Sequence, residues 1–536
     1  MTLNPLKSPN QVKRDEWAKN IFVFGIVAVL FLTLLPFDFE KPQGSYLQEI
    51  VTSFGHHSDR TDLFSNLLLF IPFGFGLAGI LEKRKIGFGK AAIAITISSL
   101  FLSATVEILQ VFLPERASTS IDIISNTISG FLGFLIFYFF KDLFFELTFW
   151  LLRVGKRWLN VKWAIAIFIT YLIFICFLLF SVRDITKLSN WDASYPLLFG
   201  NELTADRPWK GQVSQFCIAD RAASKTEVSQ LLESSNCDSI SNFLLADYDL
   251  NGNQKSYSDR TQNLPDLVSQ GTLPKKSGDS PVESLRDRGV ILNNKHWLQT
   301  IESVEKLTKN ISKTSQLTLV TTMASANPNQ EGPARIISLS KNPFARNFTL
   351  GQEGNDLSFR LRTPLTQENG ADPESIVPNV FADTQFHRVA ITYDGWILKI
   401  YIGRAATPKE YRVGNVYKLQ LSPEAALFWS VMGIFDKKIH LNPPSMWVYQ
   451  SLYSAIIFVP LGLLFAIVWV SYRGNLIFSG LVILGGIILP AFLVEGVIAS
   501  CMERSLQMGS IALGIAIETI TILGARNWFS AWLRSD

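Results

Sequence analysis

The feature that most constrains this chain is a series of apolar runs, each long enough to cross a lipid bilayer. A transmembrane helix needs about 20 predominantly apolar residues. Charged residues make up only 18% of the chain, whereas soluble domains contain about 25%. We therefore predict a polytopic α-helical membrane bundle of eight transmembrane spans, near residues 20–37, 62–81, 90–113, 120–140, 162–181, 446–471, 476–499 and 506–524.

Lysine and arginine are concentrated in alternate segments between these spans. The rich segments contain Lys7, Lys13, Arg14 and Lys19; Lys83, Arg84, Lys85 and Lys90; Arg153, Lys156, Arg157 and Lys162; Arg473; and Arg526 and Arg534. Because basic loops stay in the cytoplasm, we expect the end segments 1–19 and 525–536 to be cytoplasmic and residues 182–445 to be extracytoplasmic. The first span lacks a small-residue cleavage site, which favours a retained anchor over a signal peptide.

Polar residues gather at one depth of the first bundle, residues 20–181. The paired residues within each span are three or four positions apart, which places each pair on one helix face. Ionisable groups inside a membrane are costly unless they pair or face a cavity. We expect a polar pocket open to the outer leaflet; hydrogen bonds that only hold the helices together are the alternative. The pocket residues would be Asp62, Asn66, Glu107, Gln110, Arg116, Asp122 and Asn126.

The segments "TDLFSNLLLFIPFGFGL" and "VEILQVFLPERASTSIDIISNTISGFLG" resemble the VanZ-like family of small membrane proteins. That family has an Asp and an Asn before Pro-x-Gly, then Glu-x-x-Gln, an Arg loop, and a helix with Asp-x-x-x-Asn-x-x-x-Gly. The resemblance covers roughly residues 20–140. It implies a place in the cell envelope and a link to glycopeptide resistance, and it implies no particular reaction. Together with the composition, it suggests a bacterial inner (plasma) membrane.

The last three spans, residues 446–524, repeat part of this pattern. "FIPFGF" returns as "FVPLGL", and "VEILQVFLPER" returns as "VEGVIASCMER", in both cases 388 positions later (460 − 72 and 495 − 107). Glu495 and Arg504 then correspond to Glu107 and Arg116, and we expect them to form a pair. Because most other polar positions have changed, we predict a degenerate second copy; chance similarity between apolar segments is the alternative. The changed positions are Gln450, Ser454, Ile498, Ser510 and Gly514.

Residues 182–445 contain short alternating runs separated by turn residues, which predict an antiparallel β-sandwich. The segment "FHRVAITYDGWILKIYIGR" resembles the laminin-G-like, concanavalin A-like lectin fold. Asp394 and Gly395 suit a two-residue hairpin turn. The resemblance implies binding of carbohydrate or protein, for which Trp396 and Trp209 would stack on sugars or, equally, lie in the core. No paired carboxylates on a strand indicate glycoside hydrolysis.

Two further features belong to this extracytoplasmic segment. Cys217 and Cys237 would form a disulfide in an oxidising compartment, and two free thiols are the alternative. Asp394 and Asp247 could bind calcium, although Asp in turns more often shapes the turn. We predict no other cofactor and no dedicated metal site.

The favoured function is binding in the cell envelope. The β-sandwich would bind an envelope polysaccharide or an extracytoplasmic protein, and the membrane pocket would hold a lipid-linked, peptidoglycan-related or peptide ligand. One alternative is an enzyme acting on an envelope lipid or peptidoglycan precursor, with Glu107 or Asp62 as general base and Arg116 holding an anionic group. Another is a structural anchor for an adhesion domain. The net charge of +4 is too small to indicate nucleic acid.

Overall fold

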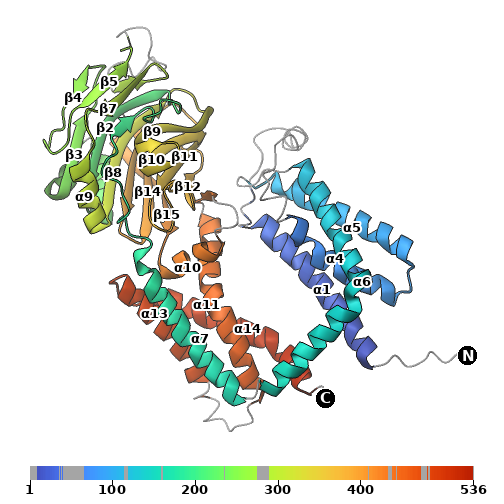
Figure 1. Ribbon diagram of the computed structural model, residues 1–536. Helices are drawn as coiled ribbons and strands as arrows, with labels where there is room; N and C mark the ends of the chain where they lie inside the picture. The colour runs from blue at the N-terminus through green and yellow to red at the C-terminus, as the bar shows by residue number, and fades with distance from the viewer. Residues whose placement is uncertain are drawn as a thin grey trace, which may run out of the picture. The chain divides into compact units, whose positions relative to one another are not determined.

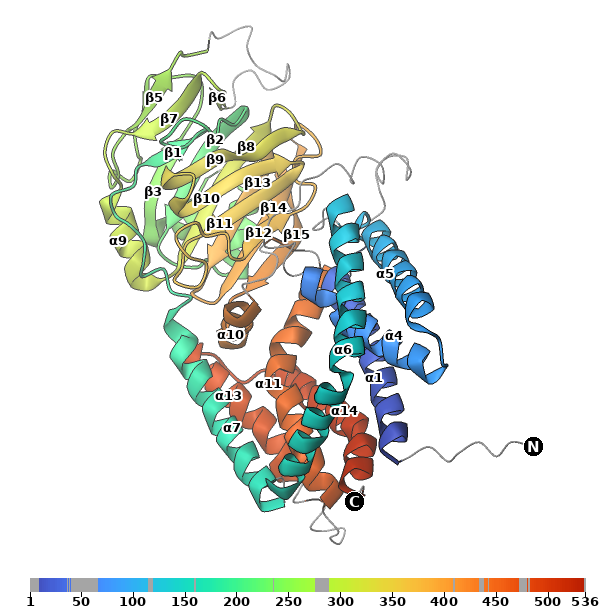
Figure 2. The ribbon, with the colours of Figure 1, turned by 45° about the vertical axis from the view of Figure 1, so that its right-hand side comes forward.

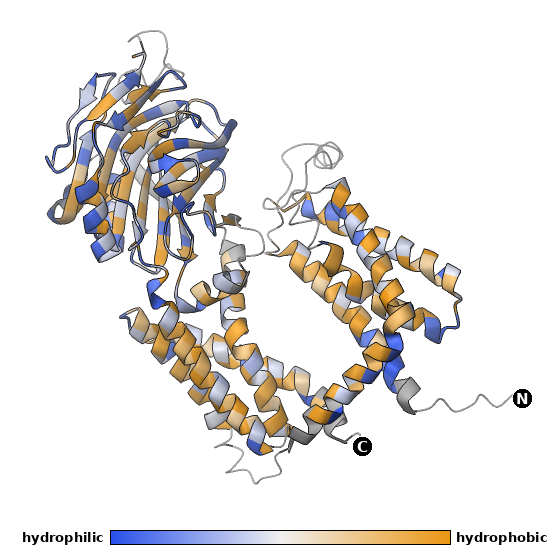
Figure 3. Ribbon diagram, in the orientation of Figure 1, coloured by the Kyte–Doolittle hydropathy of each residue, from blue (hydrophilic) through white to orange (hydrophobic). Residues whose placement is uncertain are grey.

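The computed structural model describes residues 9–35, 37, 39, 66–113, 119–158, 161–234, 236–274, 289–407, 410–432, 438–441, 443–471, 480 and 483–534 (Figures 1 and 2). The chain forms two compact units, Met1–Asn160 and Val161–Asp536. Within the described residues, eight helices are long and apolar enough to cross a membrane, which confirms the predicted number: Lys13–Leu34, Asn66–Lys83, Phe88–Gln110, Ser120–Leu151, Val161–Asp184, Met446–Val470, Leu484–Cys501 and Met508–Arg526. Figure 3 shows how apolar these helices are.

The first unit is a helical bundle. Its helices are α1 (Pro9–Leu34), α4 (Ile71–Lys83), α5 (Phe88–Gln110) and α6 (Ser120–Trp158). Helix α4 packs against both α1 and α6, and α5 packs against α6. Glycine makes the closest contact possible, because a Cβ atom on Gly74 would lie 1.9 Å from the carbonyl oxygen of Gly130. Small residues at helix contacts are how membrane bundles achieve close packing.

The second span of this unit is interrupted just before a proline. Residues 66–69 are helical, Phe70 is in a turn, and α4 then begins with Pro72 in its first turn. The backbone N–H of Phe70 donates a hydrogen bond to the Ser129 hydroxyl of α6 at 3.0 Å. A side chain of a neighbouring helix therefore satisfies a backbone group at the break, as helices in lipid require.

Charged residues lie at the end of the bundle where α1 begins and α4 ends. Arg14 Nη1 contacts Asp142 Oδ1 at 2.7 Å, and Lys83 Nζ lies 3.9 Å from Asp15 Oδ2. Lys141 also pairs with Glu82. The break near Phe70 is at the other end of α4, so the bundle has one end rich in ion pairs and one end with a broken helix.

The second unit contains the remaining spans. They are formed by α7 (Val161–Ser181), α11 (Pro443–Ser471), the π-helix η4 (Leu484–Ile488) with α13 (Leu489–Cys501), and α14 (Met508–Arg534). The Tyr171 hydroxyl of α7 donates to the Ile456 carbonyl of α11 at 3.2 Å. The chain therefore enters and leaves the β domain through two neighbouring helices.

The β domain between α7 and α11 contains two sheets (Figures 1 and 2). Its short helices are η1 (Val182–Asp184), α8 (Lys225–Glu233), η2 (Asp238–Phe243), α9 (Glu305–Thr314) and α10 (Pro423–Met432). Its strands are β1 (Leu197–Phe199), β2 (Gly211–Ala219), β3 (Leu244–Asp249), β4 (Ser256–Tyr257), β5 (Leu267–Gly271), β6 (Val290–Leu292), β7 (His296–Thr300), β8 (Leu317–Ser325), β9 (Gln330–Asn342), β10 (Ala345–Gly354), β11 (Asp356–Leu361), β12 (Glu374–Val377), β13 (His387–Tyr393), β14 (Ile397–Thr407), β15 (Glu410–Gln420) and β16 (Lys438–His440).

The two sheets share one hydrophobic core. One sheet has the strand order β16-β12-β11-β10-β9-β1-β7-β5-β4, and the other has β15-β14-β13-β8-β2-β3 with β6 paired to β2. All of these pairs are antiparallel except β12 with β16. Phe199 of the first sheet contacts Phe216 of the second, with ring centroids 5.2 Å apart. The predicted separate all-β region is therefore confirmed.

The hairpin between β13 and β14 is longer than predicted. Tyr393 pairs with Leu398, so four residues (394–397) rather than two lie between the last paired residues of the hairpin. Asp394 Oδ1 accepts hydrogen bonds from the backbone N–H groups of Trp396 and Ile397, and Gly395 has a φ of +93°. The Gly395 carbonyl accepts from the Thr186 hydroxyl at 3.0 Å. The longer turn thus presents a carbonyl that holds the segment arriving from α7.

Candidate functional site

Five of the seven predicted pocket residues lie in the described part of the first unit, and we call them the N-terminal cluster. They are Asn66 before α4, Glu107 and Gln110 on α5, and Asp122 and Asn126 on α6. Asp62 and Arg116 lie outside the described residues, as does the loop that contains Arg116. Glu107 is only 2% exposed. The cluster is therefore formed by one partly buried and four buried side chains from consecutive spans.

The centre of the N-terminal cluster is the start of α6. The backbone N–H of Thr119 donates to Glu107 Oε2 at 3.1 Å, and the Thr119 hydroxyl donates to Asp122 Oδ2 at 2.6 Å. Asn66 Nδ2 donates to the other oxygen of Asp122 at 2.7 Å. A carboxylate near a helix N-terminus is stabilised by the helix dipole and by unpaired N–H groups. Glu107 and Asp122 are thus held where negative charge is favourable.

The amide side chains extend this cluster inward. Gln110 Nε2 donates to the Thr33 carbonyl of α1 at 3.0 Å, and Asn126 Nδ2 donates to the Ser103 hydroxyl at 3.1 Å. Asn126 Oδ1 is buried and has no hydrogen-bond partner among the described residues. Since buried polar atoms are almost always paired, this oxygen is a position where an additional donor would be favourable.

The second unit contains the other predicted pair. Arg504 contacts both carboxylate oxygens of Glu495, with Nη2 lying 3.4 Å from Oε2. Glu495 lies on α13 and is 2% exposed. Its Oε1 also accepts a hydrogen bond from the backbone N–H of Gln507, just before α14, at 2.8 Å. The Glu495 carboxylate therefore connects two helix ends, as Glu107 does in the first unit.

The two clusters are related by the same sequence offset as the predicted repeat. Each buried Glu accepts from a backbone N–H 12 residues further along the chain. Thr119 and Gln507 are separated by 388 positions (507 − 119), as are Glu107 and Glu495 (495 − 107). A packing contact agrees, because a Cβ atom on Gly462 would lie 3.0 Å from the carbonyl oxygen of Glu518. This contact is the counterpart of that between Gly74 and Gly130.

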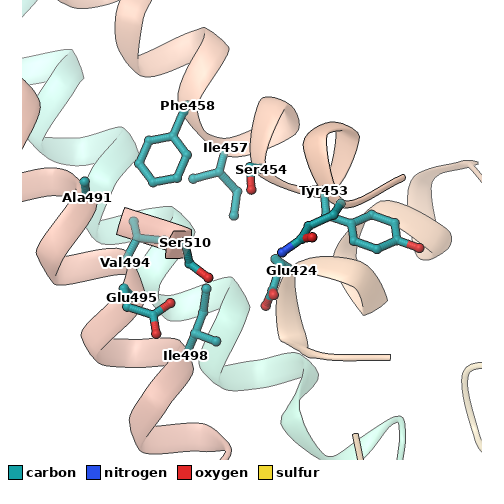
Figure 4. A pocket seen from close by; sticks show the side chains of 11 residues that line it. Glu424, Tyr453, Ser454, Ile457, Phe458, Ala491, Val494, Glu495, Ile498 and Ser510 are labelled. Atoms are coloured by element: carbon teal, nitrogen blue, oxygen red, sulfur yellow. The ribbon is translucent and has the colours of Figure 1, made fainter. Parts of the chain in front are cut away.

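The β domain contributes one carboxylate to the second cluster. Glu424 of α10 lines the same small cavity as Glu495 and Ser510, with about 20 Å³ of space (Figure 4). Gln420 Nε2 donates to Glu424 Oε1 at 2.8 Å, whereas Oε2 is buried without a partner among the described residues. Burial raises the pKa of the Glu424 carboxyl group, an effect that hydrogen bonding from Ser422 partly offsets. We call Glu424, Glu495 and Arg504 the C-terminal cluster, and its cavity has room for about one water molecule.

The residues that the sequence singled out in the β domain have structural contacts. Cys217 and Cys237 are joined by a disulfide, with their Cα atoms 6.6 Å apart. Trp209 is fully buried and its indole N–H donates to Gln352 Oε1 at 2.8 Å, so it belongs to the core. Asp394 shapes the β13–β14 turn. Asp247 Oδ2 lies 3.7 Å from Arg260, and burial raises its pKa.

No group of three or more His, Cys, Asp or Glu side chains that could hold a metal ion occurs among the described residues. Two residues of the clusters were not anticipated from the sequence. Thr119 contributes its backbone N–H to Glu107 and its hydroxyl to Asp122, and side-chain patterns do not indicate the backbone contact. Glu424 comes from α10, between strands β15 and β16, and its sequence spacing has no relation to the repeat. The only available signal was that Thr119 precedes Asp122 by three positions, as in a helix cap.

The comparison with protein families concerns the region that contains the N-terminal cluster. Residues 6–141 match the VanZ/LLP1 family model. No curated protein and no solved structure matched the chain in the corresponding searches. The VanZ/LLP1-like region includes all seven predicted pocket positions, from Asp62 to Asn126. The C-terminal cluster and the β domain lie beyond it.

Proposed function

We propose that this integral membrane protein binds the polar head of a lipid-linked or peptide ligand at its N-terminal cluster. In this proposal, the last three spans are a degenerate second copy of the VanZ/LLP1-like region. The protein would lie in a bacterial inner membrane with both termini in the cytoplasm. The concanavalin A-like β domain would be extracytoplasmic and bind an envelope glycan or protein.

A comparison of the two clusters separates structural from functional residues. Both clusters contain a buried Glu that accepts from the N-terminal end of the next helix, which indicates a role in helix packing. Only the N-terminal cluster adds polar groups deeper in the bundle: Ser510 replaces Asp122 and Gly514 replaces Asn126. Packing alone accounts for Glu495, whereas Glu107 and the polar groups beside it are the candidates for ligand binding.

The unpaired Asn126 Oδ1 is the observation that carries the proposal. Its residue is 1% exposed, and Asn126 lies within the fourth predicted span, where water cannot replace a missing partner as it does at a protein surface. A ligand with an N–H or O–H group, such as a sugar, an amino sugar or a peptide, would satisfy this oxygen. The neighbouring Asp122 and Glu107 carboxylates would attract the same kind of donor.

The β domain supports the second part of the proposal. Two sheets around one hydrophobic core are compatible with a lectin-like sandwich, and Trp396 is partly exposed in the β13–β14 turn. Aromatic side chains at such an edge provide a surface for stacking on sugar rings. The β domain is joined at both of its ends to neighbouring helices of the second unit, α7 and α11. This attachment would hold a bound polymer near the membrane.

The decisive experiment measures the lipids and envelope fragments that co-purify with the full-length protein. We would compare the wild type with Glu107→Gln and Asp122→Asn, which remove charge but keep the side-chain shape. Glu495→Gln is the matched control, because the adjoining cavity has only about 20 Å³ of space. We expect a specific lipid-linked or peptide species that is lost at least about tenfold in the first two variants, equivalent to about 1.4 kcal/mol, and retained in the control.

The other outcomes distinguish the remaining functions. If all four proteins contain the same bulk phospholipids, the pocket proposal fails and the bundle acts as an anchor for the β domain. If the specific species is found chemically altered by the wild type but unaltered with Glu107→Gln, the protein is an enzyme with Glu107 as a catalytic residue.

A further inference from the structure

A second buried carboxyl group lies in the membrane-spanning part of α14. Glu518 is halfway along the span Met508–Arg526 and is 0% exposed. Neither Oε1 nor Oε2 has a hydrogen-bond partner among the described residues. An isolated carboxylate ion in an apolar environment is so unfavourable that such a group binds a proton instead. Ionisable residues at this depth are rare and are usually functional.

The elements packed against α14 provide no counter-charge for Glu518. In their described parts, α11 has only Tyr449 and Tyr453 as titratable residues, α13 has Glu495 and Cys501, and η4 has none. Tyr449, Tyr453 and Glu495 lie toward the β-domain end of their helices, where Glu495 already pairs with Arg504. On α14 itself, the nearest cation is the exposed Arg526, eight positions away. A proton is therefore the ligand that neutralises Glu518.

The second unit has room for a side chain at position 518, whereas the equivalent position in the first unit does not. Gly130 occupies this position (518 − 388), and a Cβ atom there would lie 2.0 Å from the Ser99 hydroxyl of α5. A side chain there would force Ser99 to move. The counterpart of Ser99 is Ile487, which lies in the π-helix η4 that contacts α14. The π-helical turn η4 is wider than an α-helical turn, and it occurs where Glu518 replaces the glycine of the first unit. Such π-turns are frequent at functional sites.

We propose that Glu518 is a proton-binding site in the middle of the membrane, formed between α11, α14 and the π-helical turn η4. The carboxyl group is neutral in the resting protein. Loss of its proton places an uncompensated charge at the α11–α14 contact, where a Cβ atom on Gly462 would lie 3.0 Å from the Glu518 carbonyl oxygen. Protonation of Glu518 therefore controls how tightly these two helices pack.

Infrared spectroscopy of the full-length protein tests this proposal directly. A protonated carboxyl group has a C=O stretching band separate from that of a carboxylate. We expect the band in the wild type at neutral pH, its loss in Glu518→Gln, and its persistence in the matched variant Glu495→Gln. Absence of a band difference between the wild type and Glu518→Gln at neutral pH would overturn the proposal. If Glu518→Gln does not fold, Glu518→Gly restores the residue of the first unit and serves instead.

Chemical labelling gives an independent measurement. Dicyclohexylcarbodiimide is apolar and adds to carboxyl groups in their protonated form: the proton goes to one carbodiimide nitrogen, the carboxyl oxygen bonds to the central carbon, and acyl transfer to nitrogen leaves a stable acylurea. We expect mass spectrometry to find this adduct on the Glu518 peptide, in an amount that falls as pH rises. Absence of the adduct at neutral pH, or an amount that does not fall even at the highest pH at which the protein stays folded, would contradict reversible proton binding.

Discussion

At the level of single residues, four glutamates whose carboxylate groups are buried wholly or in part show how surroundings assign different roles to one side chain. Glu107 accepts from a helix N-terminus, and Glu495 does so while paired with Arg504. Glu424 has one oxygen bonded and one without a partner among the described residues. Glu518 has two oxygens without partners there. A buried carboxylate ion without a partner is costly, so a bound proton is most favourable at Glu518.

Glu424 makes the stability of the protein depend on pH. Because burial raises its pKa, the folded protein binds this proton more tightly than the unfolded chain does. The Glu424 carboxyl group therefore makes its full contribution to the free energy of unfolding below its unfolded pKa of about 4.3. This contribution is lost as the pH rises through the higher pKa of the folded protein. We expect Glu424→Gln to unfold at the same temperature as the wild type near that pH and at a higher temperature at neutral pH, in detergent thermal melts. If the unfolding temperatures of the two proteins change with pH in the same way, the raised pKa of Glu424 is contradicted.

The site residues that sequence could indicate were those with charged or amide side chains in apolar surroundings. Helical periodicity places Glu107 with Gln110 and Asp122 with Asn126 on common faces, which is a local property that the sequence indicates. Glu424 and the backbone of Thr119 were not predictable, because they join the clusters through tertiary packing. Glu518 was missed although it is equally misplaced, since the repeat pattern directed attention to positions with counterparts in the first copy.

At the level of elements, glycine contacts determine how closely the helices of the first unit approach. Gly74 of α4 lies against the backbone of Gly130 of α6, and Gly76 lies against the backbone of Phe22 of α1. A helix with two such contacts on different neighbours has little freedom to shift. The N-terminal cluster lies at the broken end of the same span, so its geometry depends on this packing.

Gly74→Ala tests that dependence. The added Cβ atom would lie 1.9 Å from the Gly130 carbonyl oxygen, so the helices must separate, at a cost of about 1–3 kcal/mol for overpacking. We expect a clearly lower melting temperature in detergent. Gly89→Ala in α5 is the control, because nothing lies within 4 Å of its added Cβ atom, and it should melt like the wild type. Equal melting of both variants would show that α4 and α6 are not closely packed.

Sequence patterns located these elements well but not their irregularities. The apolar runs predicted all eight spans, because length and hydropathy are properties of each segment alone. The break before Pro72, the π-turn η4 and the four-residue turn after Tyr393 were not predicted. Each depends on a partner from another element: Ser129 for the break, α14 for the π-turn, and Thr186 for the turn.

At the level of the whole molecule, the β domain is an insertion between two neighbouring helices. The C-terminal cluster lies at the end of the helices that faces this domain, because Glu424 of α10 and Glu495 of α13 line one cavity. If the domain is extracytoplasmic, as the distribution of lysine and arginine predicts, the C-terminal cluster lies toward the outer leaflet. The repeat relation then predicts the same depth for the N-terminal cluster.

Cysteine accessibility in intact cells tests this topology. With Cys176 and Cys501 replaced by serine, and Cys217 and Cys237 joined in their disulfide, a single cysteine would be introduced at exposed Glu331 in the β domain or exposed Arg84 in the predicted cytoplasmic loop. A membrane-impermeant maleimide should label Glu331→Cys at least about tenfold more than Arg84→Cys, because basic loops are retained in the cytoplasm. Permeabilised cells should label both equally. The opposite pattern would place both clusters toward the inner leaflet, where an envelope ligand could not reach them.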